Sequence, residues 1–217
     1  MIRPILVALC AATAVQAQSF EGAISMQFSD GKARAIEMAY MVKDGKVRME
    51  MPGGRGDGAG TFIMDAAARK MLIIMPAQKM YIEQSYAGLA VGAGAATSKG
   101  KPPTITPTGR KETIAGYSCE HYTVAEEGNP PTDVCIARGL GAFVLPSAGG
   151  RGPGRANSPW ERGLGEDGFP LKVQTGDKVE MLVTSIEKKP LDAALFAPPA
   201  DYSKMDMGAM LRGRPPR

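Results

Sequence analysis

The sequence has few of the residues from which catalytic and metal-binding sites are most often built. Its single histidine, His121, excludes a metal site made of several histidines, and any nucleophile activated by histidine would depend on it. The formal net charge of +4 is too small for a protein dedicated to nucleic-acid binding. Apolar runs long enough to span a bilayer are absent from the sequence. With 217 residues, the chain can form one domain with its own core.

Residues 1–17 have the pattern of a secretory signal peptide. Arg3 supplies the positive start, residues 5–15 form the apolar stretch, and Val15-Gln16-Ala17 is typical of a cleavage site. We therefore expect the chain to be exported to the periplasm and the signal peptide to be removed. Export would place the mature chain in an oxidising compartment.

Two of the three cysteines, Cys119 and Cys135, follow the signal peptide and predict a structural disulfide. A strong turn signal at 126–131 lies between them, so the flanking segments are expected to form a β-hairpin. Folding about this turn would place Cys119 opposite Cys135 and His121 opposite Asp133. A redox-active thiol pair would be expected to have Cys-x-x-Cys spacing, which this pair lacks.

Alternating apolar and polar residues run through most of the chain and predict amphipathic β-strands. The predicted strands are 20–28, 36–42, 47–51, 61–64, 70–75, 79–84, 116–124, 132–138, 169–174 and 179–186. Short turns join consecutive strands, among them Asp30-Gly31 and Asp44-Gly45, which are strong hairpin signals. We therefore expect an antiparallel sheet with one apolar face and one face in water, curled into a half-open barrel.

Helix signals are few. Asp192 can cap a short turn at 193–196, which Pro198 and Pro199 would end. An Ala/Gly-rich stretch at 86–96 is either a frayed helix or a flexible lid. The expected fold class is therefore mainly β, with one or two short helices.

A single β-rich domain is expected over residues 18–204, because no internal repeat or second domain is evident. Glycine- and proline-rich composition predicts flexible insertions near 86–108 and 147–168. Residues 205–217 include several arginines and are expected to form a disordered tail.

No catalytic motif is evident in the sequence. The chain contains no His-Glu-x-x-His, Gly-x-Ser-x-Gly or Walker-type segment. The Gly-Gly-Arg-Gly segments at 53–56 and 149–152 superficially resemble phosphate-binding loops, but neither lies between a predicted strand and a convincing helix. His121 and Asp133 are more simply interpreted as a surface ion pair than as catalytic residues. We therefore expect a protein that is not an enzyme and that has no cofactor.

Methionine is abundant, with 14 residues, and most of them lie in predicted strands. Its unbranched thioether side chain fills irregular space and adapts to varied apolar partners. The methionines are therefore either ordinary core residues or the lining of an adaptable cavity for a lipid or acyl chain. Strand parity selects the candidate ligand-binding residues Ile24, Met26, Met38, Met49, Met64 and Met80.

The C-terminal tail contains three further methionines, Met205, Met207 and Met210. Soft thioether ligands select Cu(I), so the tail is a candidate copper site, and a chance cluster in a methionine-rich chain is the alternative. The arginines of the tail and of the 147–168 insertion support a third interpretation. In that interpretation, the protein is an envelope interaction module that contacts an anionic membrane surface.

Several segments of the chain resemble an exported bacterial family, domain of unknown function 4412. They are Phe20-Glu21-Gly22, 46–50, 62–65, 79–81, 113–122 and 195–202. The resemblance covers nearly the whole mature chain, and its most specific part is the Ile-x-Gly-Tyr-x-Cys-Glu-x-Tyr pattern from Ile114 to Tyr122. The family is more distantly similar to the periplasmic lipoprotein carriers LolA and LolB. This likeness implies an incomplete antiparallel barrel with an apolar cavity covered by helices, and it carries over no catalytic site.

The alternating Met, Phe and Ile residues and the family resemblance lead to one main hypothesis. The chain is expected to be a non-enzymatic periplasmic protein that binds a lipid or another apolar ligand in a half-barrel cavity. Copper binding and membrane contact are the alternatives, and no nucleic-acid partner is expected.

Overall fold

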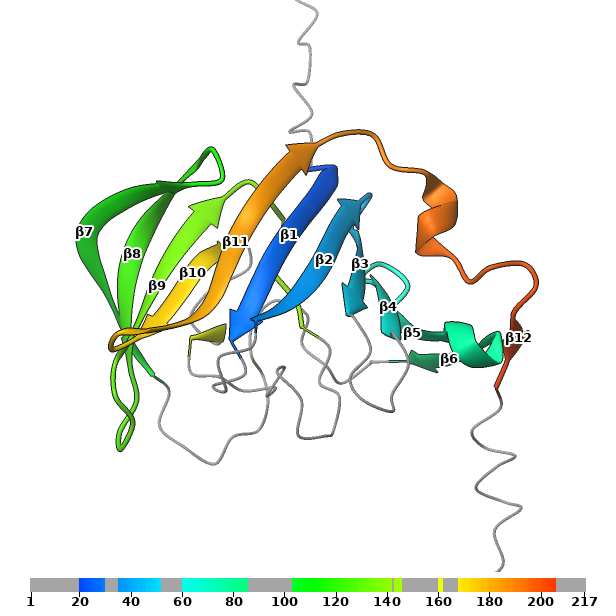
Figure 1. The fold of residues 1–217 in the computed structure, drawn as a ribbon, viewed down its shortest axis with the longest axis horizontal. Helices are drawn as coiled ribbons and strands as arrows, with labels where there is room; N and C mark the ends of the chain where they lie inside the picture. Colours follow the sequence, from blue (N-terminus) through cyan, green and yellow to red (C-terminus); the bar gives the residue numbers. More distant parts are fainter. Residues whose placement is uncertain are drawn as a thin grey trace, which may run out of the picture.

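One twelve-stranded sheet dominates the fold, as Figure 1 shows. The computed structural model describes residues 20–29, 35–51, 60–85, 103–141, 143–145, 160–161 and 168–205. The strands are β1 (Gly22–Ser29), β2 (Ala35–Lys43), β3 (Lys46–Met51), β4 (Gly60–Asp65), β5 (Lys70–Met75), β6 (Met80–Ser85), β7 (Thr104–Ile114), β8 (Tyr117–Ala125), β9 (Thr132–Arg138), β10 (Gly168–Thr175), β11 (Lys178–Lys188) and β12 (Ser203–Lys204). The predicted fold class, mainly β, is confirmed.

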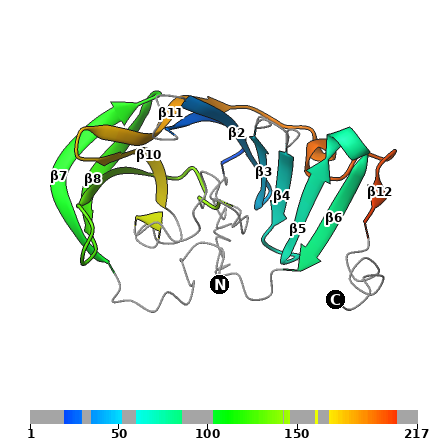
Figure 2. The same cartoon turned by 60° about the horizontal axis from the view of Figure 1, so that its bottom comes forward.

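The sheet combines two antiparallel meanders that meet at β1 and β11. Strands β1 to β6 follow one another across one half of the sheet, and β7 to β11 follow one another across the other half. The antiparallel pairing of β1 with β11 joins the halves. The sheet does not close, because β7 forms one edge and β12, parallel to β6, forms the other. Figure 2 shows the resulting open curvature, which confirms the predicted half-open barrel.

The expected short helices are 3₁₀ turns instead of α-helices. The described residues contain no α-helix, and their short elements include η1 (Pro76–Gln78) and η3 (Ala193–Phe196). The predicted cap is confirmed, because Asp192 Oδ1 accepts a hydrogen bond from the Ala194 amide at 2.9 Å. The Ala/Gly-rich segment at 86–96 lies outside the described residues. Among the described residues, no helix has both the length and the apolar character needed to cross a membrane.

Two tight turns place residues in the left-handed region of backbone space. Asp44 (φ 49°) and Gly45 (φ 72°) join β2 to β3, as the Asp-Gly signal predicts. Ala115 (φ 49°) and Gly116 (φ 83°) join β7 to β8, so the Ile-x-Gly-Tyr-x-Cys-Glu-x-Tyr segment forms this hairpin. Turns of this kind match the right-handed twist of the flanking strands, which helps to set the register of each hairpin.

Strand β7 is the main element that the sequence pattern missed. The flexible insertion predicted near 86–108 ends earlier than expected, because β7 begins at Thr104 and pairs with β8. Pro107 and Gly109 interrupt the alternation, and a register shift between Pro107 and Lys111 accommodates them. Proline is tolerated here because β7 is an edge strand, where one row of backbone groups has no partner. The rest of that insertion lies outside the described residues.

A cluster of four aromatic rings fills the centre of the concave face. Tyr40 of β2 lies 5.4 Å from Phe169 of β10 and 5.8 Å from Phe143, measured between ring centroids. Trp160 packs against Phe143 at 5.9 Å, and all four side chains are buried. Phe143 and Trp160 belong to the connection between β9 and β10, and both are part of the main core. The insertion predicted near 147–168 therefore supplies a core residue, Trp160.

The Tyr40 hydroxyl places a polar group inside this aromatic cluster. It accepts a hydrogen bond from the backbone amide of Val144 at 3.2 Å. Burial raises the pKa of the Tyr40 phenol, so the group stays neutral in the core. Because Val144 belongs to the β9–β10 connection, the bond also ties this connection to β2.

The outer face of β3–β6 is covered by the C-terminal segment, residues 189–205. Phe196 of η3 packs against Ile63 and Ile74, which form a second, smaller core. Arg48 of β3 donates a hydrogen bond to a backbone carbonyl of this segment at 2.6 Å. The prediction that one face of the sheet lies in water is therefore wrong for β4 and β5, which carry buried apolar residues on both faces.

Candidate functional site

Five of the six residues predicted to bind an apolar ligand lie in the main core. The five are Ile24, Met26, Met38, Met49 and Met64. Each is at most 5% exposed, and each belongs to one cluster with the aromatic rings of the concave face. The sixth, Met80 of β6, is half-buried. The structure therefore brings the five together, while their role in ligand binding stays a prediction.

The concave face of β3–β6 continues beyond this core as a set of half-buried apolar side chains. We refer to Met51, Phe62, Ile73, Met75, Met80 and Ile82 as the concave patch. Phe62 pairs with the core residue Met49, so the two share a face. Ile73 then pairs with both Phe62 and Ile82, which extends this face to β6. Met80 belongs to the predicted ligand-binding set, and strand parity applied to β3–β6 could have found the other members.

A groove with a volume of about 600 Å³ lies over β11, β1, β2 and β3. Its lining includes Ser25, Ala39, Ser185, Glu37 and Glu50, and also three methionines: Met26 and Met38 of the predicted ligand-binding set and Met51 of the concave patch. Ser25 pairs with Ala39, and Ala39 pairs with Glu50, so these residues share the face away from the core. Both glutamates have side-chain partners within the protein. This groove therefore combines polar and methionine side chains.

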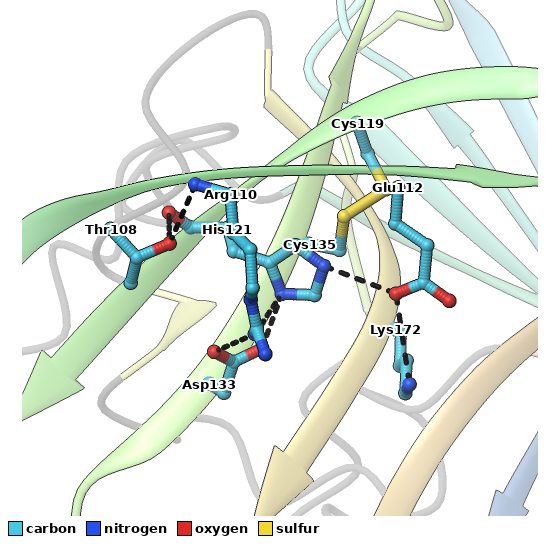
Figure 3. Close-up of a disulfide and its surroundings, with 8 residues drawn as sticks. All are labelled: Thr108, Arg110, Glu112, Cys119, His121, Asp133, Cys135 and Lys172. Carbon is cyan, nitrogen blue, oxygen red and sulfur yellow. Dashed lines mark hydrogen bonds and ion pairs between the residues drawn. A yellow bond between two sulfur atoms is a disulfide. The ribbon is translucent and has the colours of Figure 1, made fainter.

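His121 lies at the centre of a polar cluster, drawn in Figure 3. It is 3% exposed, and both of its ring nitrogens face a carboxylate. Nδ1 lies 2.5 Å from Asp133 Oδ1, and Nε2 lies 3.1 Å from Glu112 Oε2. Arg110 donates to Asp133 at 2.6 Å, and Lys172 Nζ lies 3.7 Å from Glu112. The predicted side-chain contact between His121 and Asp133 is confirmed. The histidine is buried, however, so the expectation of an ion pair on the surface is wrong.

The predicted disulfide between Cys119 and Cys135 is confirmed, and it borders this cluster. The hairpin register differs from the expected one, because β8 and β9 pair His121 with Cys135 and Thr123 with Asp133. Direct opposition of the two cysteines, and of His121 and Asp133, is therefore wrong by two residues. The bond links a diagonal pair of cysteines whose Cα atoms are 5.4 Å apart.

The turn between β8 and β9 lies within the loop that sets the observed register. β9 begins at Thr132, as predicted, directly after Pro130 and Pro131, which have no backbone N–H group. The reverse turn precedes them, with the Asn129 amide donating to the Glu126 carbonyl at 3.1 Å. The centre of the hairpin thus moves one residue towards the C-terminus, which moves every cross-strand partner by two.

Sequence reasoning missed the other charged members of the His121 cluster. Arg110 and Glu112 lie on β7, the strand that the alternation pattern did not reveal. Lys172 lies on β10, where it pairs with Cys135. No local signal marks these residues, because they meet only through the register of four neighbouring strands.

The candidate copper ligands are only partly described. Met205 follows β12, and its backbone amide donates to the Tyr81 carbonyl at 2.8 Å. Met207 and Met210 lie outside the described residues, as do the predicted signal peptide at 1–17 and most of the predicted tail. Copper binding, export and membrane contact therefore stay predictions.

Comparisons with known proteins place the chain in a family. No curated protein matches it. A crystal structure of an uncharacterised conserved protein from Thermus thermophilus is similar over 87% of this chain and 91% of that chain, with a TM-score of 0.48 and 11% sequence identity. The more distant likeness to LolA and LolB is not confirmed by these findings. A family model matches residues 20–202, and the chain therefore belongs to the family described as domain of unknown function DUF4412.

Proposed function

We propose that the protein binds an apolar ligand, the acyl chain of a lipid, along the concave patch and performs no chemistry on it. The observation that supports this proposal is the incomplete burial of the apolar side chains in the concave patch. The patch continues the face of the main core, yet its side chains stay half-buried among the described residues. Contiguous apolar surface of this kind marks ligand-binding or interaction sites.

The shape of the patch suits a slender chain. Phe62, Ile73 and Ile82 pair in succession, so they form a row that crosses β4, β5 and β6. Adjacent strands are about 4.8 Å apart, so this row extends for about 10 Å across the strands. Met75 and Met80 form the next row along the strands. Their flexible thioethers can adapt to an alkyl chain without requiring one fixed geometry.

We also propose that the protein acts in the periplasm. The predicted signal peptide and the Cys119–Cys135 disulfide both support an oxidising compartment. An exported protein of this kind would meet lipids of the cell envelope, which supply the proposed ligand.

The test is binding of a fluorescent fatty acid to the purified, oxidised chain. Ile82→Glu places a carboxylate in the concave patch, where it would have to lose water against the alkyl chain. We expect this variant to lower the affinity for the probe at least about tenfold, because desolvating an ionised carboxylate costs several kcal/mol. Ile105→Glu is the matched control, because Ile105 is 37% exposed on β7, outside the concave patch. We expect the control to bind as the unsubstituted chain does.

Two results would contradict the proposal. One is the absence of any saturable binding by the unsubstituted chain. The other is an equal loss of affinity in both variants, with circular dichroism showing that both remain folded. Either result would mean that the concave patch is not an acyl-chain site.

A further inference from the structure

Two neighbouring cross-strand pairs bring four residues of metal-ligating types together. Glu112 of β7 pairs with Cys119 of β8, and His121 of β8 pairs with Cys135 of β9. Paired residues share a face of the sheet, as do residues two apart on a strand, so these four side chains project from the same face. A Glu112 oxygen, a His121 nitrogen and Cys135 Sγ all lie within 4.8 Å of one another. Cys119 Sγ is bonded to Cys135 Sγ.

This donor set matches the preferences of zinc. Zn²⁺ usually binds four ligands in tetrahedral geometry, drawn from thiolates, imidazole nitrogens and carboxylate oxygens. At the usual bond lengths, a nitrogen and an oxygen on one tetrahedral zinc ion lie roughly 3.4 Å apart. His121 Nε2 and Glu112 Oε2 are 3.1 Å apart. These two side chains therefore stand close to the separation that a shared ion requires.

Asp133 orients the histidine for this role. Asp133 Oδ1 and Arg110 Nη2 both approach Nδ1, at 2.5 and 2.7 Å, so protein groups fix the orientation of the ring. Nε2 is the nitrogen nearer Glu112, and it would bind a metal after releasing any proton that it shares with this carboxylate. Arg110 donates a hydrogen bond to Asp133 in turn. Figure 3 shows these residues together with His121 and the disulfide. Metal-binding histidines commonly have such a carboxylate on the second ring nitrogen.

The charge around the cluster also suits a metal with thiolate ligands. Two thiolates and one carboxylate exceed the charge of Zn²⁺ by one negative unit. Lys172 supplies a nearby cation, with Nζ 3.7 Å from Glu112 Oε2. The excess charge thus has a compensating group within the same cluster.

We propose that the reduced chain binds Zn²⁺ through Cys119, Cys135, His121 and Glu112, and that disulfide formation abolishes this site. An external dithiol reduces the bond by transferring two electrons and two protons to the sulfur atoms, and the dithiol itself becomes a disulfide. Zn²⁺ then replaces the two thiol protons, which pass to water. In the oxidised chain, neither sulfur is a thiolate, so only the histidine and the carboxylate remain as ligands.

The test compares the full chain in its two redox states. One sample is synthesised in a cell-free system with a phosphine reductant, and the other is allowed to form the disulfide. Both are titrated with Co²⁺ as a spectroscopic probe and then with Zn²⁺. We expect the reduced chain to bind a single Co²⁺ with a thiolate-to-cobalt absorption band that Zn²⁺ removes. A reduced chain without this band, or an oxidised chain with equal affinity, would overturn the proposal.

A pair of matched variants tests the carboxylate ligand. Glu112→Gln keeps the size of a partly exposed side chain and removes its charge, and we expect Zn²⁺ affinity to fall at least about tenfold. Glu120→Gln is the control, because Glu120 points to the other face of β8 and pairs with the exposed Lys111. Equal affinities of the two variants would overturn the assignment of Glu112. The oxidised, unsubstituted chain is the reference in which neither Cys119 nor Cys135 is a thiol, so no substitution of these cysteines that could prevent folding is needed.

Discussion

The concave face of the sheet is covered in two different ways. In its centre, the aromatic cluster, which includes Phe143 and Trp160 of the β9–β10 connection, belongs to the main core, and Tyr40 and Phe169 are 0% exposed. Along β3–β6, the concave patch stays half-buried, and the C-terminal segment covers the outer face of these strands instead. The chain thus completes its core in one region and leaves apolar surface in the other, which is the surface that the proposed ligand would use.

The two ends of the sheet differ as well. Near the β7 edge, a disulfide and a buried histidine cluster hold β7, β8 and β9 together. At the opposite end, which we call the β6 edge, the two-residue strand β12 lies beside β6. Backbone hydrogen bonds and ion pairs on the surface hold it there. Surface ion pairs contribute little to stability, so we expect the β6 edge to be the weaker of the two.

The largest effect is expected from emptying the aromatic cluster. Phe169→Ala leaves a cavity in a fully buried region and should lower the free energy of unfolding by about 3–5 kcal/mol. Met80→Ala in the concave patch should cost about 1 kcal/mol or less, because its side chain is only partly removed from water on folding. Urea unfolding of both variants measures the difference. Equal losses would mean that the concave patch is an ordinary part of the core.

The next largest effect is expected from removing the disulfide. Replacing both Cys119 and Cys135 with serine should lower the free energy of unfolding by about 3 kcal/mol, because the unfolded chain is no longer constrained by the cross-link. Urea unfolding under oxidising conditions measures the loss. The reduced, unsubstituted chain in a metal chelator is the control and should resemble the variant. An unchanged stability would show that the β7 edge does not depend on its covalent link.

A smaller effect is expected at the cap of η3. Asp192→Ala removes the side-chain hydrogen bond to the Ala194 amide and should cost about 1 kcal/mol. Asp201→Ala is the matched control on the same segment, since Asp201 makes an exposed ion pair with Lys79 and should change stability by less than the loss of the cap does. Hydrogen exchange of the Leu195 amide reports on the same segment. Equal effects of the two variants would contradict the role of the cap.

The smallest effect is a pH dependence at the β6 edge. Hydrogen bonds from Lys204 and Lys70 lower the pKa of Glu83. Because this pKa is lower in the folded than in the unfolded chain, the contribution of Glu83 is complete above the ordinary glutamate pKa. It is lost as the pH falls through the lowered value. We expect hydrogen exchange at the Met205 amide to accelerate over this acidic range, and Glu83→Gln to remove that dependence. An identical pH profile in the variant would exclude Glu83 as the cause.

Short-range patterns explain which parts of the fold were predictable. The alternation in β1–β3 and the Asp44-Gly45 turn act over a few residues, so they are visible without tertiary structure. Strand β7 was hidden because Pro107 and Gly109 interrupt its pattern, and it forms only by pairing with β8. The hairpin register did not follow from the turn signal alone, because the pairing of β8 with β9 is centred on residue 128 instead of 127, which moves each partner by two positions.

The candidate sites were predictable to different degrees. The buried methionines followed from strand parity, because alternate residues share a face. Their ligand-binding role did not follow, because parity cannot show whether the chain itself covers them. The charged groups around His121 were less accessible still, since Glu112 lies on β7, which the pattern did not reveal, and Lys172, the partner of Glu112, lies on the distant strand β10.

By itself, the sequence determined the β content, the tight Asp-Gly turn and the cysteine pair. These properties depend on residues close in the chain, or on the small number of cysteines that follow the predicted signal peptide. Only the tertiary structure decided which apolar side chains stay half-buried and which charged groups surround the histidine. The physical reason is that burial and clustering depend on how distant strands align and on which segments cover them. Neither property can be read from a local pattern.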